Sequence, residues 1–213
     1  MYKIRVLFAK DEPACYISHL DLMKALQRSL RRAALPVRYS SGFNPHIVLS
    51  ILVPLSTGYR SRYDLFDFEL TSDEMPEGLT ERLNAALPAG LRVLRVGQAV
   101  RPVAQAVLCS FEVVWHGVHC AKAAAKAFAS PIRLEKRSKR GSKEIDLQDY
   151  VRSFDFAERG EDTVCRCVLQ AGEDPLNPAY LTQAMTEKGI LPETAAVTYT
   201  RCAILDENGK EFF

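Results

Sequence analysis

The sequence predicts an α+β protein built from two tandem ferredoxin-like units, each with the element order β-α-β-β-α-β, an antiparallel sheet and both helices on one face of that sheet. Two observations predict this fold. In the first half of the chain, segments with apolar residues at a spacing of two and segments with apolar residues at helical spacing follow one another in this order. A similar succession follows in the second half, after a stretch with little periodicity. We therefore expect domains at residues 1–97 and 107–213, joined by a linker at 98–106.

The first unit is expected to begin with a strand at residues 2–9, where aromatic and β-branched residues alternate with mostly basic ones. A helix follows, because Ser18 and Asp21 have the spacing of a capping box, and Leu35-Pro36 ends it. The remaining elements are strands at 47–55 and 63–70, a helix from Pro76 to Gly90 and a strand at 91–96.

The second unit repeats the pattern with one long interruption. The expected elements are a strand at 108–115, a helix at 121–129, two extended segments around a basic turn within 131–156, a strand at 163–169, a helix at 178–188 and a strand at 196–205. The interruption also has room for a short extra helix around Leu147 to Val151.

Composition excludes several classes of protein. The chain has 213 residues, 47% of them hydrophobic and 25% charged, with a net charge of +2, so an anionic partner must be met by local patches. Six scattered cysteines without a C-x-x-C pair, and a start without a signal-peptide apolar run, predict a cytoplasmic protein with free thiols. No apolar run reaches the length of a membrane span, and no metal or cofactor motif is present, so we expect no membrane, metal or cofactor.

A basic helix flank and the loop that follows it form the first candidate binding region. Cationic groups beside exposed aromatic rings suit single-stranded RNA, because the cations neutralise phosphates and the rings stack on unpaired bases. The alternatives are a solvated helix face and a plain helix-to-strand connection. The candidate residues are Lys24, Arg28, Arg31, Arg32 and Arg38 on the flank, and Tyr39, Ser40, Gly42, Phe43, Asn44 and His46 in the loop.

A basic turn at residues 133–143 is the second candidate region, with six basic residues and one acidic residue. This clustering is typical of a phosphate-binding turn, and the alternative is a flexible charged hairpin. The candidate residues are Arg137, Lys139, Arg140 and Lys143.

His19 and His46 are weak catalytic candidates. His19 is expected at the first position of the basic helix, where the helix dipole disfavours imidazolium and suits a general base. The acidic residues Asp64, Asp67 and Glu69 offer two alternatives, a cation site or pairing with the arginines of the basic helix, and pairing is the preferred interpretation.

The first 70 residues carry a family resemblance. The chain resembles the radical-SAM-linked protein family, a bacterial domain-of-unknown-function family encoded beside or fused to a B12-binding-type radical SAM protein. The resemblance implies a partner and no activity. It departs at Ile47, Asp64 and Asn177, where the family usually has proline, glutamate and arginine. The matching residues are Ser18 to Met23, Arg28, Arg31 to Ala33, Leu35-Pro36, Tyr39-Ser40, Gly42 to His46, Pro54-Leu55, Gly58, Ser61 and Asp67 to Leu70, with weaker matches at Lys143 to Asp146 and Leu176 to Pro178.

These features together lead us to expect an accessory RNA-binding protein that helps a radical SAM enzyme engage a tRNA or rRNA substrate, without activity of its own. One alternative is a metal-independent endoribonuclease of the tandem ferredoxin-like type, with His19 or His46 as the base. The other is a protein-interaction scaffold that binds no nucleic acid.

Overall fold

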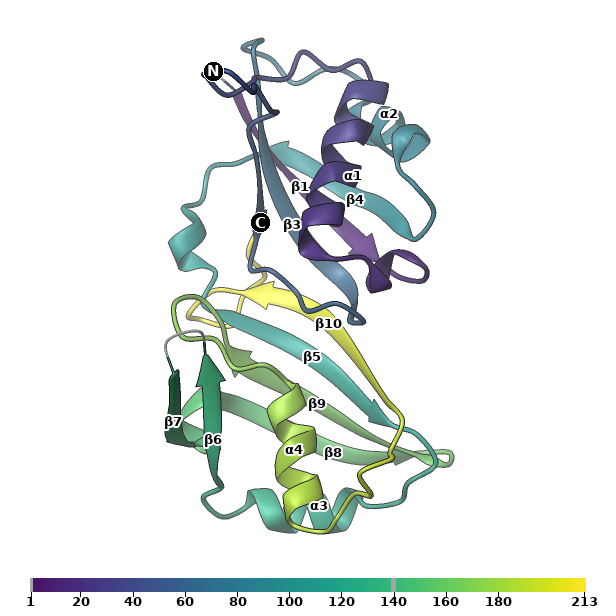
Figure 1. Ribbon diagram of the computed structural model, residues 1–213, viewed down its shortest axis with the longest axis vertical. Helices are drawn as coiled ribbons and strands as arrows, with labels where there is room; N and C mark the ends of the chain where they lie inside the picture. The colour runs from purple at the N-terminus through teal and green to yellow at the C-terminus, as the bar shows by residue number, and fades with distance from the viewer. Residues whose placement is uncertain (1, 139–140) are drawn as a thin grey trace. The chain divides into compact units, whose positions relative to one another are not determined.

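The structure is a computed structural model that describes residues 2–138 and 141–213 (Figure 1). The chain divides into two compact units, which are considered separately. The first consists of Met1–Ala106 and Lys210–Phe213, and the second of Val107–Gly209. The last four residues, which the sequence analysis assigns to the second domain, therefore group with the first unit.

The first unit contains β1 (Tyr2–Lys10), a 3₁₀ turn (Ala14–Tyr16), α1 (His19–Arg32), β2 (Leu49–Leu52), β3 (Arg60–Leu70), α2 (Leu79–Ala86), β4 (Leu91–Gln98) and a second 3₁₀ turn (Val103–Gln105). Its strands pair in the order β4-β1-β3-β2, and every pairing is antiparallel. The element order is therefore β-α-β-β-α-β, as the apolar periodicity predicts.

Both helices of the first unit cover the same face of its sheet (Figure 1). Leu26 of α1 and Leu83 of α2 belong to one buried apolar cluster with Phe8 of β1 and Phe66 of β3. The rings of Phe8 and Phe66 meet edge to face with centroids 5.5 Å apart. The alternate positions of these strands face away from the helices, and they include Arg5 and Asp67.

Local backbone geometry sets the ends of these elements. The serine cap of the predicted capping box is confirmed, because Ser18 Oγ accepts a bond from Asp21 N at 3.1 Å, and the Ser18 hydroxyl also donates to Asp21 Oδ2 at 2.7 Å. Helix α1 ends before the predicted Leu35-Pro36, since Ala34 has a left-handed φ of 50°. Strand β2 is shorter than the predicted 47–55, because Val53 has a φ of 46° and its peptide leaves the ladder.

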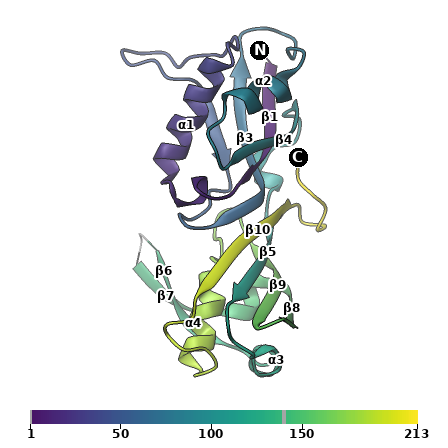
Figure 2. The ribbon, with the colours of Figure 1, turned by 90° about the vertical axis from the view of Figure 1, so that its right-hand side faces the viewer.

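The second unit contains β5 (Leu108–Trp115), α3 (Ala121–Phe128), β6 (Arg133–Ser138), β7 (Gly141–Asp146), a 3₁₀ turn (Leu147–Tyr150), β8 (Val151–Arg159), β9 (Asp162–Gln170), α4 (Ala179–Glu187) and β10 (Val197–Leu205). Its main sheet has the antiparallel order β10-β5-β9-β8, while β6 and β7 form a separate two-stranded sheet. In Figure 2 this hairpin stands apart from the main sheet of its unit and beside α4. The extra helix expected around Leu147 to Val151 is the 3₁₀ turn.

A fully buried tryptophan organises the core of the second unit. The indole N–H of Trp115 donates to Thr182 Oγ1 of α4 at 3.0 Å, and the indole ring stacks on Phe156 of β8 at 6.2 Å. Phe128 of α3 lies 5.2 Å from Phe156 between ring centroids. Helices α3 and α4 therefore lie on the Trp115 face of the sheet.

The α+β class is confirmed, with mostly antiparallel strands and four α-helices in the described part of the chain. The ferredoxin-like identity of the two units stays a prediction. Within residues 2–138 and 141–213, no helix combines the length and apolar character that crossing a membrane requires.

Candidate nucleic-acid interface

The loop between Tyr39 and His46 is closed at its base by side-chain and backbone bonds. Ser40 N donates to His46 O at 2.7 Å, and His46 N donates to Ser40 Oγ at 3.1 Å. Ser40 Oγ also lies 2.9 Å from His46 Nδ1. Tyr39 and Ile47, just outside this closure, form an antiparallel bridge. The loop therefore has a defined base, formed by Ser40 and His46.

The tip of this loop presents an aromatic side chain to solvent. Phe43 is fully exposed, and Gly42 before it has a φ of 117°, which a residue with a side chain adopts only with strain. Asn44 and Pro45 are exposed as well. Phe43 adds no buried area to the core, so the fold gives no reason for a phenylalanine at this position.

Cationic residues of the basic flank are exposed along α1, and Lys24, Arg28 and Arg31 are among them. The guanidinium carbon of Arg31 lies 5.8 Å from the centre of the Tyr39 ring, which joins the helix to the first residue of the loop region. Lys24 makes a surface ion pair with Asp21 at 3.6 Å. The structure thus brings Arg31 and Tyr39 together.

The other two arginines of the predicted set hold the fold together. Arg32 donates through Nε to Ala86 O at 3.1 Å, where it caps the last turn of α2. Arg38 forms an ion pair with Glu69 Oε2 at 2.5 Å, and Arg38 N bonds Glu69 O at 2.8 Å. Both guanidinium groups already have protein partners, so Arg28 and Arg31 are better placed to meet a ligand.

The two histidines have different surroundings. His46 uses Nδ1 for its contact with Ser40, and His19 is the exposed first residue of α1. No group of three or more metal-ligating side chains occurs in the described ranges. The structure therefore places His46 at the closure of the loop.

The predicted acidic residues Asp67 and Glu69 have different partners. Asp67 accepts two bonds from Arg5, at 2.8 Å from Nε and 2.9 Å from Nη2, and both side chains are almost fully buried. Glu69 pairs with Arg38, which follows the basic helix. Asp67 thus pairs with a strand arginine, not with the helix, and Asp64 is a buried residue on the same strand.

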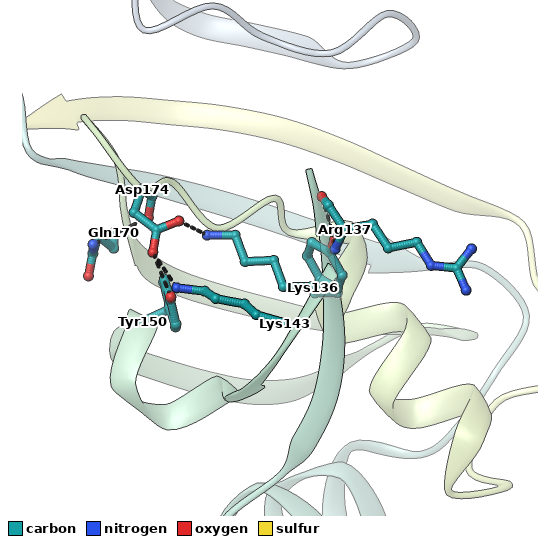
Figure 3. A network of polar contacts seen from close by, with 7 residues as sticks. Lys136, Arg137, Lys143, Tyr150, Gln170 and Asp174 are labelled. Carbon is teal, nitrogen blue, oxygen red and sulfur yellow. Dashed lines mark hydrogen bonds and ion pairs between the residues drawn. The ribbon is translucent and has the colours of Figure 1, made fainter. Parts of the chain in front are cut away.

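The carboxylate of Asp174 bonds both strands of the basic hairpin and so helps to hold the hairpin against its own unit (Figure 3). Asp174 accepts bonds from Lys136 Nζ, from Lys143 Nζ at 3.0 Å and from the Tyr150 hydroxyl at 2.6 Å. These donors hold the pKa of Asp174 well below its ordinary value, with Lys136 first among the causes. The ammonium of Lys136 also lies 4.3 Å from the centre of the Tyr150 ring. Lys143 is therefore a structural partner of Asp174 as well as a predicted binding residue.

The remaining hairpin residues of the prediction are Arg137, Lys139 and Arg140. Arg137 is exposed, and its Nη2 lies 3.1 Å from Glu135 Oε2. Lys139 and Arg140 lie outside the described residues. The amide of Arg137 donates to the Tyr180 hydroxyl at 2.9 Å, which ties β6 to α4.

Sequence reasoning missed Asp174, Tyr150 and Tyr180. Asp174 and Tyr150 lie outside the cationic run, and Tyr180 falls at an ordinary helix position, so local pattern did not distinguish them. The surplus of cations at 133–143 was the available signal, because like charges on a short hairpin repel one another and a nearby anion relieves that repulsion.

A second polar cluster joins strand ends in the second unit. His116 Nδ1 lies 3.1 Å from Asp162 Oδ2, and its Nε2 lies 2.8 Å from Thr198 Oγ1. Gly117 N donates to Asp162 Oδ1 at 3.0 Å and is the leading cause of a lowered Asp162 pKa. The cluster connects the end of β5, the start of β9 and the start of β10.

No curated protein matches this chain. A solved structure titled "Crystal Structure of an Unknown Protein from Galdieria sulphuraria" is similar at 12% sequence identity, over 94% of this chain and 98% of that one, with a TM-score of 0.29. A TM-score this low carries no argument about the fold. Residues 3–178 match the DUF2344 family, which is described as "Uncharacterized protein conserved in bacteria". Since this match spans most of the sequence, the chain belongs to the DUF2344 family.

Proposed function

We propose that this protein is an RNA-binding accessory factor, whose first unit recognises single-stranded RNA through α1 and the loop that follows it. The single observation that carries the proposal is the exposed Phe43 on a loop closed by Ser40 and His46. A rigidly based loop with an aromatic tip loses little conformational freedom on binding, so most of its contact energy is retained as affinity.

The cationic side chains near the aromatic loop favour RNA over an apolar ligand as the binding partner. Arg28 and Arg31 are exposed on α1, and Arg31 already contacts the ring of Tyr39. Guanidinium groups neutralise phosphates, while aromatic faces stack on bases whatever their sequence. Tyr39 and Phe43 offer two such rings within one short segment.

The repeated architecture supports the same proposal. We interpret both units as ferredoxin-like, because the strands of each main sheet and its two helices follow the order β-α-β-β-α-β, with both helices on one sheet face. In the second unit the hairpin β6–β7 is an insertion between α3 and β8. This insertion carries the second cationic region, so each unit contributes basic groups to the proposed function.

The partner in the proposal is a radical SAM protein, with tRNA or rRNA as the shared substrate. It rests on the residue-level resemblance described above, which centres on α1 and its loop. The accessory role itself rests on the lack of recognisable catalytic or cofactor motifs in the sequence.

The test is the binding of a fluorescein-labelled 20-nucleotide single-stranded RNA, measured by anisotropy from 50 to 300 mM salt. Phe43→Ser is expected to weaken binding by about 1–3 kcal/mol, the usual cost of losing a stacked ring. Arg28→Ala and Arg31→Ala are each expected to reduce the slope of log K against log salt by about 0.7. Matched controls are Val100→Ser and Arg92→Ala, an exposed apolar residue and an exposed arginine of the same unit.

Two results would overturn the proposal. One is the absence of binding at 50 mM salt. The other is an affinity of Phe43→Ser equal to that of Val100→Ser, since both remove an exposed apolar side chain and only one belongs to the loop.

The exposure of Phe43 also favours a second candidate, a docking loop for a protein partner without nucleic acid. Exposed aromatic residues are frequent binding hot spots. Affinity purification with and without ribonuclease separates the two candidates. A protein partner retained after ribonuclease treatment and lost in Phe43→Ser supports docking, whereas loss on ribonuclease treatment alone supports RNA.

A further inference from the structure

An open pocket lies in the second unit between strand β6 and the start of helix α4. Its volume is about 370 Å³, and its lining includes Lys136, Arg137, Asn177, Tyr180 and Gln183. Small-molecule sites occupy roughly 300–1,000 Å³, so this pocket suits one nucleotide but not a longer segment. The lining combines one aromatic ring, two amides and two cations, the side-chain types that recognise a nucleotide.

The ring of Tyr180 is held in place before any ligand arrives. Its hydroxyl accepts a bond from the Arg137 amide at 2.9 Å, and α4 fixes its backbone. A side chain with two such anchors gives up little rotamer freedom when a base stacks on it. Tyr180 is half-buried, so part of the ring remains accessible from the pocket.

The two amides are anchored by neighbouring groups of α4. Asn177 Oδ1 accepts from Ala179 N at 2.9 Å, and Gln183 Nε2 donates to Glu187 Oε1 at 2.8 Å. An amide side chain carries both a donor and an acceptor, which matches the mixed edge of a nucleobase. Asn177 and Gln183 are therefore suited to contact the edge of a base that stacks on Tyr180.

Arg137 is the cation that can reach a phosphate. The Lys136 side chain is only 9% exposed and its ammonium bonds Asp174, whereas the Arg137 side chain is 81% exposed. Its pairing with Glu135 is a surface ion pair, which contributes little and is exchanged at low cost. A guanidinium can also bind phosphate through two parallel hydrogen bonds.

We propose that this pocket binds one unpaired nucleotide of an RNA, with its base stacked on Tyr180, its base edge at Asn177 and Gln183, and its phosphate paired with Arg137. The inference rests on the proposed function and names a second contact point for the same RNA. A base inside a duplex cannot enter, because both of its faces are already stacked.

The experiment measures binding of fluorescein-labelled ten-nucleotide oligo(U) and oligo(A) to the full chain, with duplexes of the same length and free UMP and AMP as competitors. Tyr180→Ala is expected to weaken oligonucleotide binding by about 5- to 150-fold, the range for one lost stacking ring. Tyr180→Phe keeps the ring but removes the bond to Arg137, and it is expected to stay within about threefold of wild type.

Charge is tested with a matched pair. Arg137→Gln is expected to weaken binding and reduce its salt dependence, while Arg152→Gln, which removes an exposed arginine of β8, leaves both unchanged. Photocrosslinking with 4-thiouridine RNA is expected to label the peptide that contains Tyr180.

Each contrary result has a distinct meaning. Equal losses in Tyr180→Ala and Tyr180→Phe would assign Tyr180 to hairpin anchoring and overturn the inference. Competition by micromolar UMP or AMP would show a free-nucleotide site instead of an RNA site. RNA binding that is weakened by Phe43→Ser but unchanged by Tyr180→Ala would overturn this inference alone. The absence of RNA binding at low salt would overturn the proposed function as well.

Discussion

Removal of the Asp174 carboxylate is expected to loosen the β6–β7 hairpin. This carboxylate is the shared acceptor for Lys136, Lys143 and Tyr150, and through Lys136 and Lys143 it holds both strands of the hairpin. The perturbation is Asp174→Ala, with Asp174→Asn as a variant that keeps the shape and removes the charge.

The magnitude follows from the exposure of each partner. Asp174 is 45% exposed, so its attraction to the exposed Lys143 is screened and contributes at most about 1 kcal/mol. Lys136 is different, because its side chain is only 9% exposed and its ammonium would lose its anion in a nearly dry site. An unpaired polar group of this kind costs roughly 1–3 kcal/mol. We therefore expect Asp174→Ala to cost about 2–3 kcal/mol of local stability and Asp174→Asn about 1–2 kcal/mol.

The pH dependence has a definite sign. The pKa of Asp174 is lowered from its ordinary value of 3.8 in the folded chain, so the folded state favours the charged carboxylate. Its stabilisation is fully present above pH 3.8 and is lost as the pH falls toward the lowered folded-state pKa. The difference in stability between wild type and Asp174→Asn is therefore constant near neutral pH and shrinks only in strong acid.

Hydrogen exchange of the amides in β6 and β7 is the direct assay, because it reports local opening without assuming that the two units unfold together. Asp155→Ala, which removes an exposed aspartate of β8, is the matched control. The reasoning would be refuted if hairpin exchange in Asp174→Ala matched that of Asp155→Ala, or if its stability difference grew on acidification.

Three further perturbations concern the first unit. Asp67→Ala leaves the buried guanidinium of Arg5 without its carboxylate partner. It is expected to lower the free energy of unfolding, measured in urea, by about 3–5 kcal/mol. The double variant Arg5→Met with Asp67→Leu should recover most of that loss. A double variant as unstable as Asp67→Ala, or less stable, would contradict this explanation of the loss. Ser18→Ala removes the cap of α1 and is expected to cost about 1 kcal/mol, seen as a lower thermal midpoint; no shift would contradict the capping role. Phe43→Ser is expected to leave stability within about 0.5 kcal/mol of wild type, because the ring is exposed; a larger loss in urea unfolding would show that Phe43 serves the fold.

Short-range sequence patterns were sufficient to predict the helix cap and the loop of the candidate site in the first unit. The cap of α1 joins Ser18 to Asp21, only three residues apart, so its geometry follows from the helix itself. The loop from Tyr39 to His46 was recognisable because its glycine and proline have conformational preferences of their own. Strand ends were harder to predict, as Val53 shows, since its left-handed backbone contradicts the preference of a β-branched residue.

Charge partners could not be read from the sequence, because pairing depends on which strands become neighbours. The sequence showed Asp67 and Glu69 on one strand face, yet only the β1–β3 register brings Arg5 to Asp67. Arg31 and Arg32 differ for the same reason. Arg32 bonds the end of α2, 54 positions away, whereas Arg31 contacts Tyr39 beside the loop.

The sequence alone determined the α+β class, the order of strands and helices in the first unit, and the loop with its exposed aromatic tip, because these depend on periodicity and turn chemistry within a few residues. In the second unit it predicted two extended segments within 131–156, where the structure has the three strands β6, β7 and β8. The tertiary structure decided which cations remain available for a ligand. It assigned Lys136 and Lys143 to Asp174, and it placed Tyr180 against β6. Such contacts join residues about 30 to 45 positions apart, and only packing brings side chains at that separation within hydrogen-bond distance.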